Sequence, residues 1–298
     1  MIHLDDAQVS TLLPSPTEQV ALMRKTLLAL ADGSASVTPK TQVVHEEGGF
    51  DNAMPAAWPE RGLLGIKWVT VTPSNRARGR EMIGGLMVLS AADGSTRATM
   101  DAAELTAQRT AAVTGASLAL DDRPITFVGT GVQARSHARV IEALGRGPLA
   151  VWGRRPKALR ELAAWCAEHT PGLELRTTTD RSEALTGAGV VVSGLPIGLT
   201  DAALQPGDVA ADATLLPIDY ASVAGAEISR TGTVVADDAE QFESLRPLKH
   251  GEDYPRATGS TGDLLRDGRP GGLVVAQNLG SGLGDVVLAD AVARAAGA

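Results

Sequence analysis

A glycine-rich turn is the clearest chemical feature of the chain. The segment ITFVGTGVQA, residues 125–134, places Gly129, Gly131 and Ala134 directly after an apolar stretch and before a helix-forming one. In a G-x-G-x-x-A pattern the first glycine permits a tight turn, the second lets the backbone approach a pyrophosphate, and the alanine lets helix and strand pack closely. The N–H groups at the helix start then face the phosphates. The pattern predicts a dinucleotide site, and a plain tight turn is the simpler alternative.

The residues after the next expected strand indicate which nicotinamide cofactor binds. Sites for NAD usually place an acidic side chain about 20 residues beyond the glycine turn, where it accepts the ribose hydroxyls. Here the chain reads Gly153-Arg154-Arg155, with no acid. Because an arginine there can pair with a 2′-phosphate, NADP(H) is favoured and NAD(H) is the alternative. Two solvated arginines are a further alternative, although the helix dipole disfavours positive charge at a helix start. The expected cofactor-binding residues are Gly129, Gly131, Val132, Gln133, Ala134, Arg154, Arg155 and Thr106.

Three cationic side chains in the first part of the chain stand among apolar neighbours. Lys67 lies in LLGIKWVTV, Lys40 opens a strand-like stretch at TPKTQVV, and Arg109 lies in the alanine-rich TAQRTAAV. A cation in apolar surroundings needs an anionic partner, so we expect the three to converge on a substrate carboxylate. The simpler alternatives are a strand lysine that points to solvent at Lys67 and a structural salt bridge at Arg109.

The elements that would position these residues change character at Pro124. Before it we expect strands and long helices, and after it short strands and helices alternate, which is typical of a doubly wound parallel sheet. The fold class is therefore α/β. The expected elements are helices at 16–31, 101–120, 132–144 and 156–169, and strands at 37–44, 63–72, 82–89, 124–129, 149–152, 173–178, 190–193, 209–218 and 234–236. The final stretch, 273–298, has a strand-like start and an alanine-rich helix.

Composition excludes several classes of protein. The 298 residues carry a net charge of −8 with no basic stripe, which argues against a nucleic-acid partner. Cys166 is the single cysteine, so no intramolecular disulfide is expected, and no metal-ligand spacing stands out. The N-terminus MIHLDDAQ carries acids where a signal peptide has positive charge, and no apolar run is long enough to span a membrane. We expect a cytoplasmic protein without a membrane partner.

Several of these segments together resemble the ornithine cyclodeaminase and mu-crystallin family. The resemblance is carried by MPAAWPERGLLGIKWVTVTPSN, DGSTRATMDAAELTAQRTAAVTGASLAL and ITFVGTGVQARSH, and continues more faintly to VVAQNLGSGLGDVVLADAVARAA. It implies a Rossmann-type dinucleotide domain, at 122–272, beside a discontinuous α+β domain for substrate binding and dimerisation. We place this second domain at 1–121, with 273–298 folding back onto it. A homodimer is expected.

The same resemblance implies roles for individual residues. Lys67 matches the family's active-site lysine, which sits beside the nitrogen and carboxylate of the substrate. Arg109 matches the arginine of T-A-x-R-T, which binds the substrate carboxylate. Asp219 falls where cyclodeaminases place an aspartate that handles the substrate amine or an attacking water. The expected catalytic residues are thus Lys67 and Asp219, and the expected substrate-binding residues are Lys40, Lys67 and Arg109.

Two departures from the family pattern bear on the reaction. Lys40 stands where the family usually has an arginine, and Asn52 is nearest to the place of a glutamate that cyclodeaminases carry. We therefore expect a net oxidoreductase, an imine reductase or amino-acid dehydrogenase, that transfers hydride between NADP(H) and the α-carbon of a small amino or imino acid. One alternative is an ornithine- or lysine-type cyclodeaminase that releases ammonia and recycles its cofactor, which the retained Asp219 favours. Another is a non-catalytic, NADPH-binding protein of the crystallin type.

Overall fold

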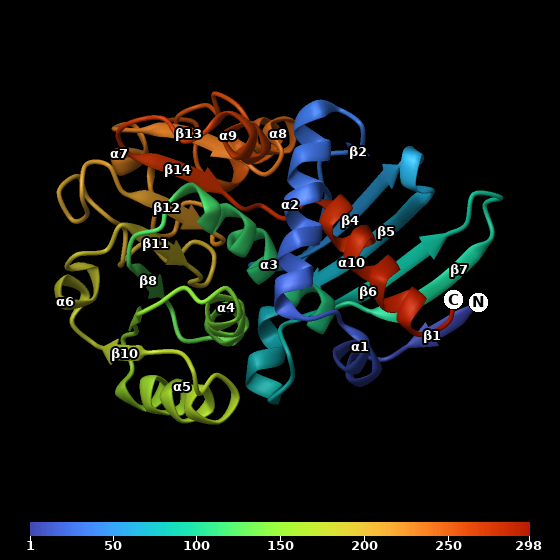
Figure 1. Ribbon diagram of the computed structural model, residues 1–298, viewed down its shortest axis with the longest axis horizontal. Helices are drawn as coiled ribbons and strands as arrows, with labels where there is room; N and C mark the ends of the chain where they lie inside the picture. The colour runs from blue at the N-terminus through green and yellow to red at the C-terminus, as the bar shows by residue number, and fades with distance from the viewer. The chain divides into compact units, whose positions relative to one another are not determined.

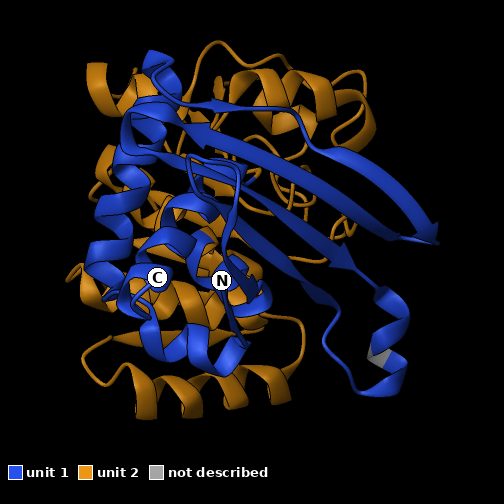
Figure 2. Cartoon of the chain, turned by 90° about the vertical axis from the view of Figure 1, so that its right-hand side faces the viewer, with its two compact units in different colours: residues 1–109, 280–298 blue, residues 110–279 orange. Residues whose placement is uncertain are grey.

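The protein consists of two compact units. A computed structural model describes residues 1–298, except for the side chain of Arg76. Unit 1 contains Met1–Arg109 and Gly280–Ala298, and unit 2 contains Thr110–Leu279 (Figure 2). The chain passes from the first unit to the second and returns for its last helix, so unit 1 is discontinuous in sequence.

Unit 1 is built on a seven-stranded sheet in the order β1-β7-β6-β5-β4-β2, with β3 also paired to β4. The edge strand β1 runs parallel to β7, and the other neighbours are antiparallel. The strands are β1 (Ile2–Leu4), β2 (Ser36–Val37), β3 (Thr41–Glu46), β4 (Gly49–Trp58), β5 (Leu63–Val71), β6 (Ile83–Ser90) and β7 (Thr96–Asp101). The helices are α1 (Asp6–Leu12), α2 (Pro16–Asp32), α10 (Gly282–Ala295) and the first half of α3 (Ala103–Ser117).

Helix α10 covers one face of this sheet. It packs on β4, β5, β6 and α2, as Figure 1 shows with α10 in red across the strands. The helix is buried along nearly its whole length. Because side chains of a strand alternate between the two faces, every second residue of β5 points toward α10. Leu63, Gly65, Lys67 and Val69 are the buried set.

Unit 2 is a parallel sheet of seven strands in the order β10-β9-β8-β11-β12-β14-β13. From β8 the strands follow chain order outward to β10 on one side and to β12 on the other, which is the arrangement of a Rossmann-type doubly wound sheet. Beyond β12, β14 lies between β12 and β13. The strands are β8 (Ile125–Val128), β9 (Leu149–Trp152), β10 (Leu175–Thr178), β11 (Val190–Ser193), β12 (Thr214–Pro217), β13 (Thr233–Ala236) and β14 (Val274–Gln277). The helices are α4 (Val132–Ala143), α5 (Pro156–His169), α6 (Arg181–Leu185), α7 (Ala226–Ser229), α8 (Ala239–Lys249) and α9 (Thr261–Asp267).

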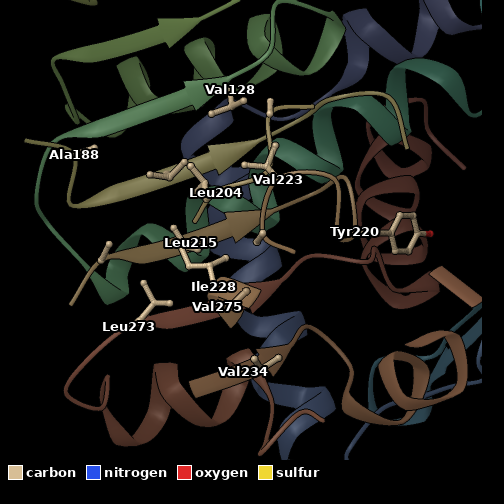
Figure 3. Close-up of a cluster of buried hydrophobic side chains, with 14 of the residues drawn as sticks. Val128, Ala188, Leu204, Leu215, Tyr220, Val223, Ile228, Val234, Leu273 and Val275 are labelled. Carbon is tan, nitrogen blue, oxygen red and sulfur yellow. The ribbon is translucent and has the colours of Figure 1, made fainter. Parts of the chain in front are cut away.

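Two apolar clusters bury the two faces of this sheet. One joins Phe127 and Val192 to Ala134 of α4 and Leu159 of α5. The other, drawn in Figure 3, joins Leu215 and Val275 to side chains such as Ile228 of α7 and Val234. Strands buried on both faces read as continuous apolar runs, which is why β8, β11 and β12 could be predicted from the sequence.

The expected fold class is confirmed, and the element boundaries differ in places. The expected strand 37–44 is two short strands, β2 and β3, separated by Thr38–Lys40. Strand β4 was not expected, because Asn, Ala and Pro in FDNAMPAAW disfavour a strand prediction. Its pairing with both β3 and β5 outweighs that weak local preference.

Two further expectations are corrected. The helix expected from Asp101 begins at Ala103, because Asp101 ends β7, and the backbone N–H of Glu104 donates to Asp6 Oδ1 (3.0 Å). Residues 273–279 were expected with the first domain, but β14 pairs with β12 and β13 in unit 2. Of the final stretch, only Gly280–Ala298 belongs to unit 1.

Within the described residues, none of the helices combines the length and the apolar character that crossing a bilayer would require.

Candidate functional site

Lys67 is buried on the inner face of the unit 1 sheet. Its side chain is 1% exposed, and it stands between Gly65 and Val69 on the face of β5 that α10 covers. The alternative of a solvent-pointing lysine is therefore wrong. A buried ammonium group needs partners, because removing it from water is costly.

The partner of Lys67 is an acid supplied by α10. Lys67 Nζ lies 2.8 Å from Asp285 Oδ2 and donates a hydrogen bond to Thr106 Oγ1 (3.3 Å). On the other side of the same carboxylate, Arg109 Nε donates to Asp285 Oδ1 (2.7 Å). Asp285 is fully buried, and its carboxylate lies between these two cations. Lys67 and Arg109 lie together as expected, but around Asp285 of the protein itself, so the salt bridge considered for Arg109 is present. Convergence of these two cations and Lys40 on a substrate carboxylate stays a prediction.

Burial and the neighbouring charges together lower the pKa of Lys67 to about 7. Burial is the main cause of the lowering; Asp285 opposes it, while Arg109 and Lys40 add to it by repulsion. Burial raises the pKa of Asp285, but Arg109 and Lys67 together hold it below its ordinary value. The site therefore combines a permanent anion with a lysine that can exchange a proton near neutral pH, the property that general acid–base catalysis requires.

Glycines let α10 bring Asp285 this close. A Cβ added at Gly282 would lie 2.6 Å from the carbonyl oxygen of Met54 in β4. Gly280 has φ +80°, which favours glycine, and a Cβ there would collide with the terminal nitrogens of Arg109. The glycines of the GSGLGD segment therefore let α10 approach β4 and leave room for the guanidinium group of Arg109.

Asp285 was missed by the sequence analysis. The signal that could have found it is an acid within the apolar run GLGDVVLAD, because an isolated charge there needs a cation. Lys40, one of the expected cations, precedes β3, is partly exposed and acts on Lys67 through its charge. Asn52 of β4 is buried, and its Oδ1 accepts a hydrogen bond from Gln42 Nε2 (3.1 Å), so a neutral side chain occupies that place.

In unit 2 the glycine turn joins β8 to α4 as expected. Gly129 has φ +133°, and a Cβ there would lie 2.8 Å from the carbonyl oxygen of Gly194, so only glycine fits. A Cβ at Gly131 would meet open space, and Gly131 is the residue that precedes the first turn of α4. Ala134 is 2% exposed and packs in the core cluster with Phe127. The turn thus has the geometry in which backbone N–H groups at a helix start face a phosphate.

The first turn of α4 is fixed by hydrogen bonds within unit 2. Val132 is half exposed at the helix start, and Gln133 follows it with Oε1 buried and without a partner in the described contacts. The carbonyl oxygen of Gln133 accepts from His137 Nδ1 (2.7 Å), which leaves Nε2 to accept from Thr114 Oγ1 (3.0 Å). Burial lowers the pKa of His137 to about 4, so the imidazole is neutral, and this histidine has a structural part.

Arg154 and Arg155 follow β9 at the same edge of the sheet as the glycine turn. Both are exposed at the start of α5, and Arg154 Nη1 pairs with Asp201 Oδ2 (2.5 Å). No acidic side chain stands directly after β9, as the sequence indicated. Thr106, expected at the cofactor, lies in unit 1 and accepts a hydrogen bond from Lys67.

Asp219 follows β12 and is held by the end of β11. Ser193 Oγ donates to its Oδ1 (2.8 Å) and the backbone N–H of Leu195 donates to its Oδ2 (2.9 Å). Burial raises its pKa to about 6 in spite of these two hydrogen bonds. Each carboxylate oxygen therefore accepts a hydrogen bond from the end of β11 or from the segment after it. Strand β11 is the neighbour of β8 in the sheet. Asp219 lies in unit 2 and Lys67 in unit 1.

Comparisons with known proteins agree with this architecture. A Δ1-pyrroline-2-carboxylate/Δ1-piperideine-2-carboxylate reductase of Azospirillum brasilense is 35% identical over 173 residues, 55% of this chain and 53% of that protein. The ketimine reductase mu-crystallin of Mus musculus is 30% identical over 176 residues, 54% of this chain and 52% of that protein. The chain therefore spans about half the length of these curated relatives.

A solved structure extends the likeness to the whole fold. The Δ1-pyrroline-2-carboxylate reductase of Thermococcus litoralis, in complex with NADH and L-proline, superposes with a TM-score of 0.85 at 20% identity, over 99% of this chain and 97% of that chain. The sequence model of the ornithine cyclodeaminase/mu-crystallin family matches residues 4–246. The chain belongs to the ornithine cyclodeaminase/mu-crystallin family.

Proposed function

We propose that the protein is an NADP(H)-dependent reductase of small imino acids. The observation that carries this proposal is the buried Lys67, with its pKa near 7 and with Arg109 beside it on a shared carboxylate. A donor of a single proton next to a carboxylate-binding arginine is what reduction of an α-imino acid requires. The two named relatives, which reduce pyrroline and ketimine substrates, support the same class.

Each group of this chain has a distinct part in the proposed reaction. Arg109 pairs with the substrate carboxylate through the terminal nitrogens of its guanidinium group and so fixes the α-carbon. Lys67 gives its proton to the substrate nitrogen as the C=N bond becomes a C–N bond. A bound nicotinamide supplies the hydride that the α-carbon receives. The balance is one hydride and one proton for each imine reduced to an amine.

The glycine turn and the two arginines support NADP(H) as the cofactor. Gly131 leaves open space at the start of α4, where the pyrophosphate of a dinucleotide would meet backbone N–H groups. Arg154 and Arg155 are exposed after β9, at the edge where a 2′-phosphate would lie. Asp201 already pairs with Arg154, so it orients the guanidinium group and also competes with a phosphate. NAD(H) is the alternative cofactor.

Asp219 favours the reductase over a cyclodeaminase. A cyclodeaminase needs a base for the substrate amine, but both oxygens of Asp219 accept hydrogen bonds from Ser193 and Leu195. The neutral, hydrogen-bonded Asn52 likewise offers no acid at the place where cyclodeaminases carry a glutamate. The raised pKa of Asp219 is the one feature that speaks for the cyclodeaminase.

The outer face of the unit 1 sheet supports a homodimer. Opposite the buried set of β5, Leu64 and Trp68 are 45% and 42% exposed, and Leu86, in register with Trp68, is 38% exposed. A contiguous exposed apolar face of this kind marks a protein interface. We propose that two copies pair through it, and light scattering after Trp68→Glu should give the mass of a monomer. An unchanged dimer mass would reject this face as the interface.

Consumption of NADPH with a panel of substrates tests the proposed function. Absorbance of the reduced nicotinamide should fall when five- and six-membered cyclic imino acids are added, with one NADPH consumed for each amine formed. With ornithine or lysine at constant NADPH, the same protein should form no cyclic product. Cyclic product and ammonia at constant NADPH would establish a cyclodeaminase instead, and binding of NADPH without any turnover would indicate a binding protein.

A further inference from the structure

Asp285 is a buried carboxylate that contacts two buried cations of unit 1, Lys67 and Arg109. Its two oxygens lie 2.8 Å from Lys67 Nζ and 2.7 Å from Arg109 Nε, and it is 0% exposed. Buried ion pairs of this kind add little net stability, because the cost of taking charges out of water offsets their attraction. A role in the chemistry accounts for this arrangement better than a role in folding does.

We propose that Asp285 is the positioning residue of the site, which aims the guanidinium group of Arg109 and controls how readily Lys67 gives up its proton. This inference rests on the proposed function, because it assigns Asp285 a part in the proton and carboxylate chemistry of Lys67 and Arg109. Asp285 contacts neither substrate nor cofactor in this account, and it acts only through the two cations.

The contact with Arg109 fixes which of its donors face a substrate. A guanidinium group has five N–H donors, and Nε–H is used by Asp285. The terminal nitrogens lie against Gly280, where any larger residue would displace them. With Nε held and Gly280 behind it, the guanidinium plane cannot rotate freely, so its terminal N–H groups are pre-oriented for two parallel hydrogen bonds to a carboxylate.

The contact between Asp285 and Lys67 favours the protonated lysine, and three other influences oppose it. Burial, Arg109 and Lys40 all favour the neutral amine, and Asp285 is the group that favours the ammonium form. The residues in register with Lys67 on the flanking strands, Met54 and Met87, do not titrate. Thr106 of α3 accepts a hydrogen bond from Lys67 and carries no charge. Removing Asp285 would therefore leave burial and two cations acting against the ammonium form of Lys67.

The pH dependence of Asp285→Asn tests the inference. The alkaline limb of the kcat/KM profile for imine reduction should move to a pH lower by about 1–3, the effect of removing one opposite charge at contact distance. Asp285→Glu, which restores the carboxylate, should return the limb toward its wild-type place. The matched control is Asp290→Asn, which removes another acid of α10 that pairs with two arginines, Arg97 and Arg294, and should leave the limb unmoved. An Asp285→Asn enzyme that is slower at every pH with an unmoved limb would overturn the inference, because a merely structural residue gives that result.

A second measurement uses the wild-type protein and needs neither turnover nor a folded Asn variant. In protein with 13C-labelled aspartate carboxylates and lysine side chains, NMR should show the Asp285 carboxylate signal, assigned from Asp285→Glu, shifting at the pH where Lys67 titrates. The Asp290 signal should show no inflection there. An Asp285 signal that stays constant through that titration would overturn the inference even if imine reduction is established. A shared inflection in a protein without reductase activity would support the coupling and reject only the proposed function.

Discussion

Raising the pH from 7 to 9 should slow imine reduction by about 50-fold, because Lys67 must be protonated to act and its pKa is about 7. At a pKa of 7 half of the molecules carry the ammonium at pH 7, and about 1% carry it at pH 9. An ordinary lysine, with a pKa near 10.4, would stay protonated over this whole range. The assay is kcat/KM from NADPH absorbance between pH 5.5 and 9.5, with a cyclic imino acid as substrate.

The control for this profile is the residual rate of Lys67→Met. An imine substrate can titrate in the same range, and its limb would persist in the variant, whereas a limb caused by Lys67 would disappear. We expect Lys67→Met to lose about 10²–10⁴-fold in rate at pH 7, the usual contribution of a general acid. A wild-type profile that stays flat to pH 9, or a variant with nearly the wild-type rate, would refute the assignment of Lys67 as the proton donor.

Three further variants test the remaining assignments. Arg154→Ala with Arg155→Ala should weaken NADPH binding by about 2–4 kcal/mol and leave NADH binding nearly unchanged, as expected for charge-assisted phosphate contacts. Equal losses for both cofactors, or the same loss in the control Lys157→Ala, would contradict the assignment of NADP(H). Arg109→Lys keeps the charge but cannot hold Asp285 and a carboxylate together, so turnover should fall on the order of 10²-fold with little change in cofactor affinity, and normal turnover would make Arg109 purely structural. Asp219→Asn should lower the free energy of unfolding by about 1–3 kcal/mol, because its amide nitrogen would face a hydrogen-bond donor. The rate of imine reduction should fall only several-fold, and a stable but inactive variant would favour the cyclodeaminase.

The Rossmann-type unit could be predicted in detail because its signals are local. A strand buried on both faces is a continuous apolar run, and the glycine turn follows it within a few residues. Gly129 and Ala134 therefore lie where the sequence indicated, one against Gly194 and the other in the core. The end of this unit was harder to locate, because β14 and α10 follow each other closely in sequence and the apolar pattern of residues 273–298 does not reveal where the chain changes units.

The unit 1 site could be predicted only in part, because its key contact is long-range. Residue types indicated that Lys67 and Arg109 needed an anion, but the anion they contact is 176 residues beyond Arg109. Lys67 could equally have faced solvent, since a single residue of register decides which face of β5 it occupies. The cap of α3 by Asp6 of α1, 98 residues away, escaped prediction for the same reason. Local pattern shows that a charge needs a partner but not which partner the fold supplies.

The most direct test of the central claim is the fate of the hydride. With NADPH that carries deuterium at the transferable position of the nicotinamide, the amino acid formed from a cyclic imino acid should contain one deuterium at its α-carbon, with one NADP+ formed per product molecule. Mass spectrometry of the product and absorbance of the cofactor give both numbers from one reaction. Unlabelled product, or product formed without net oxidation of NADPH, would contradict the account.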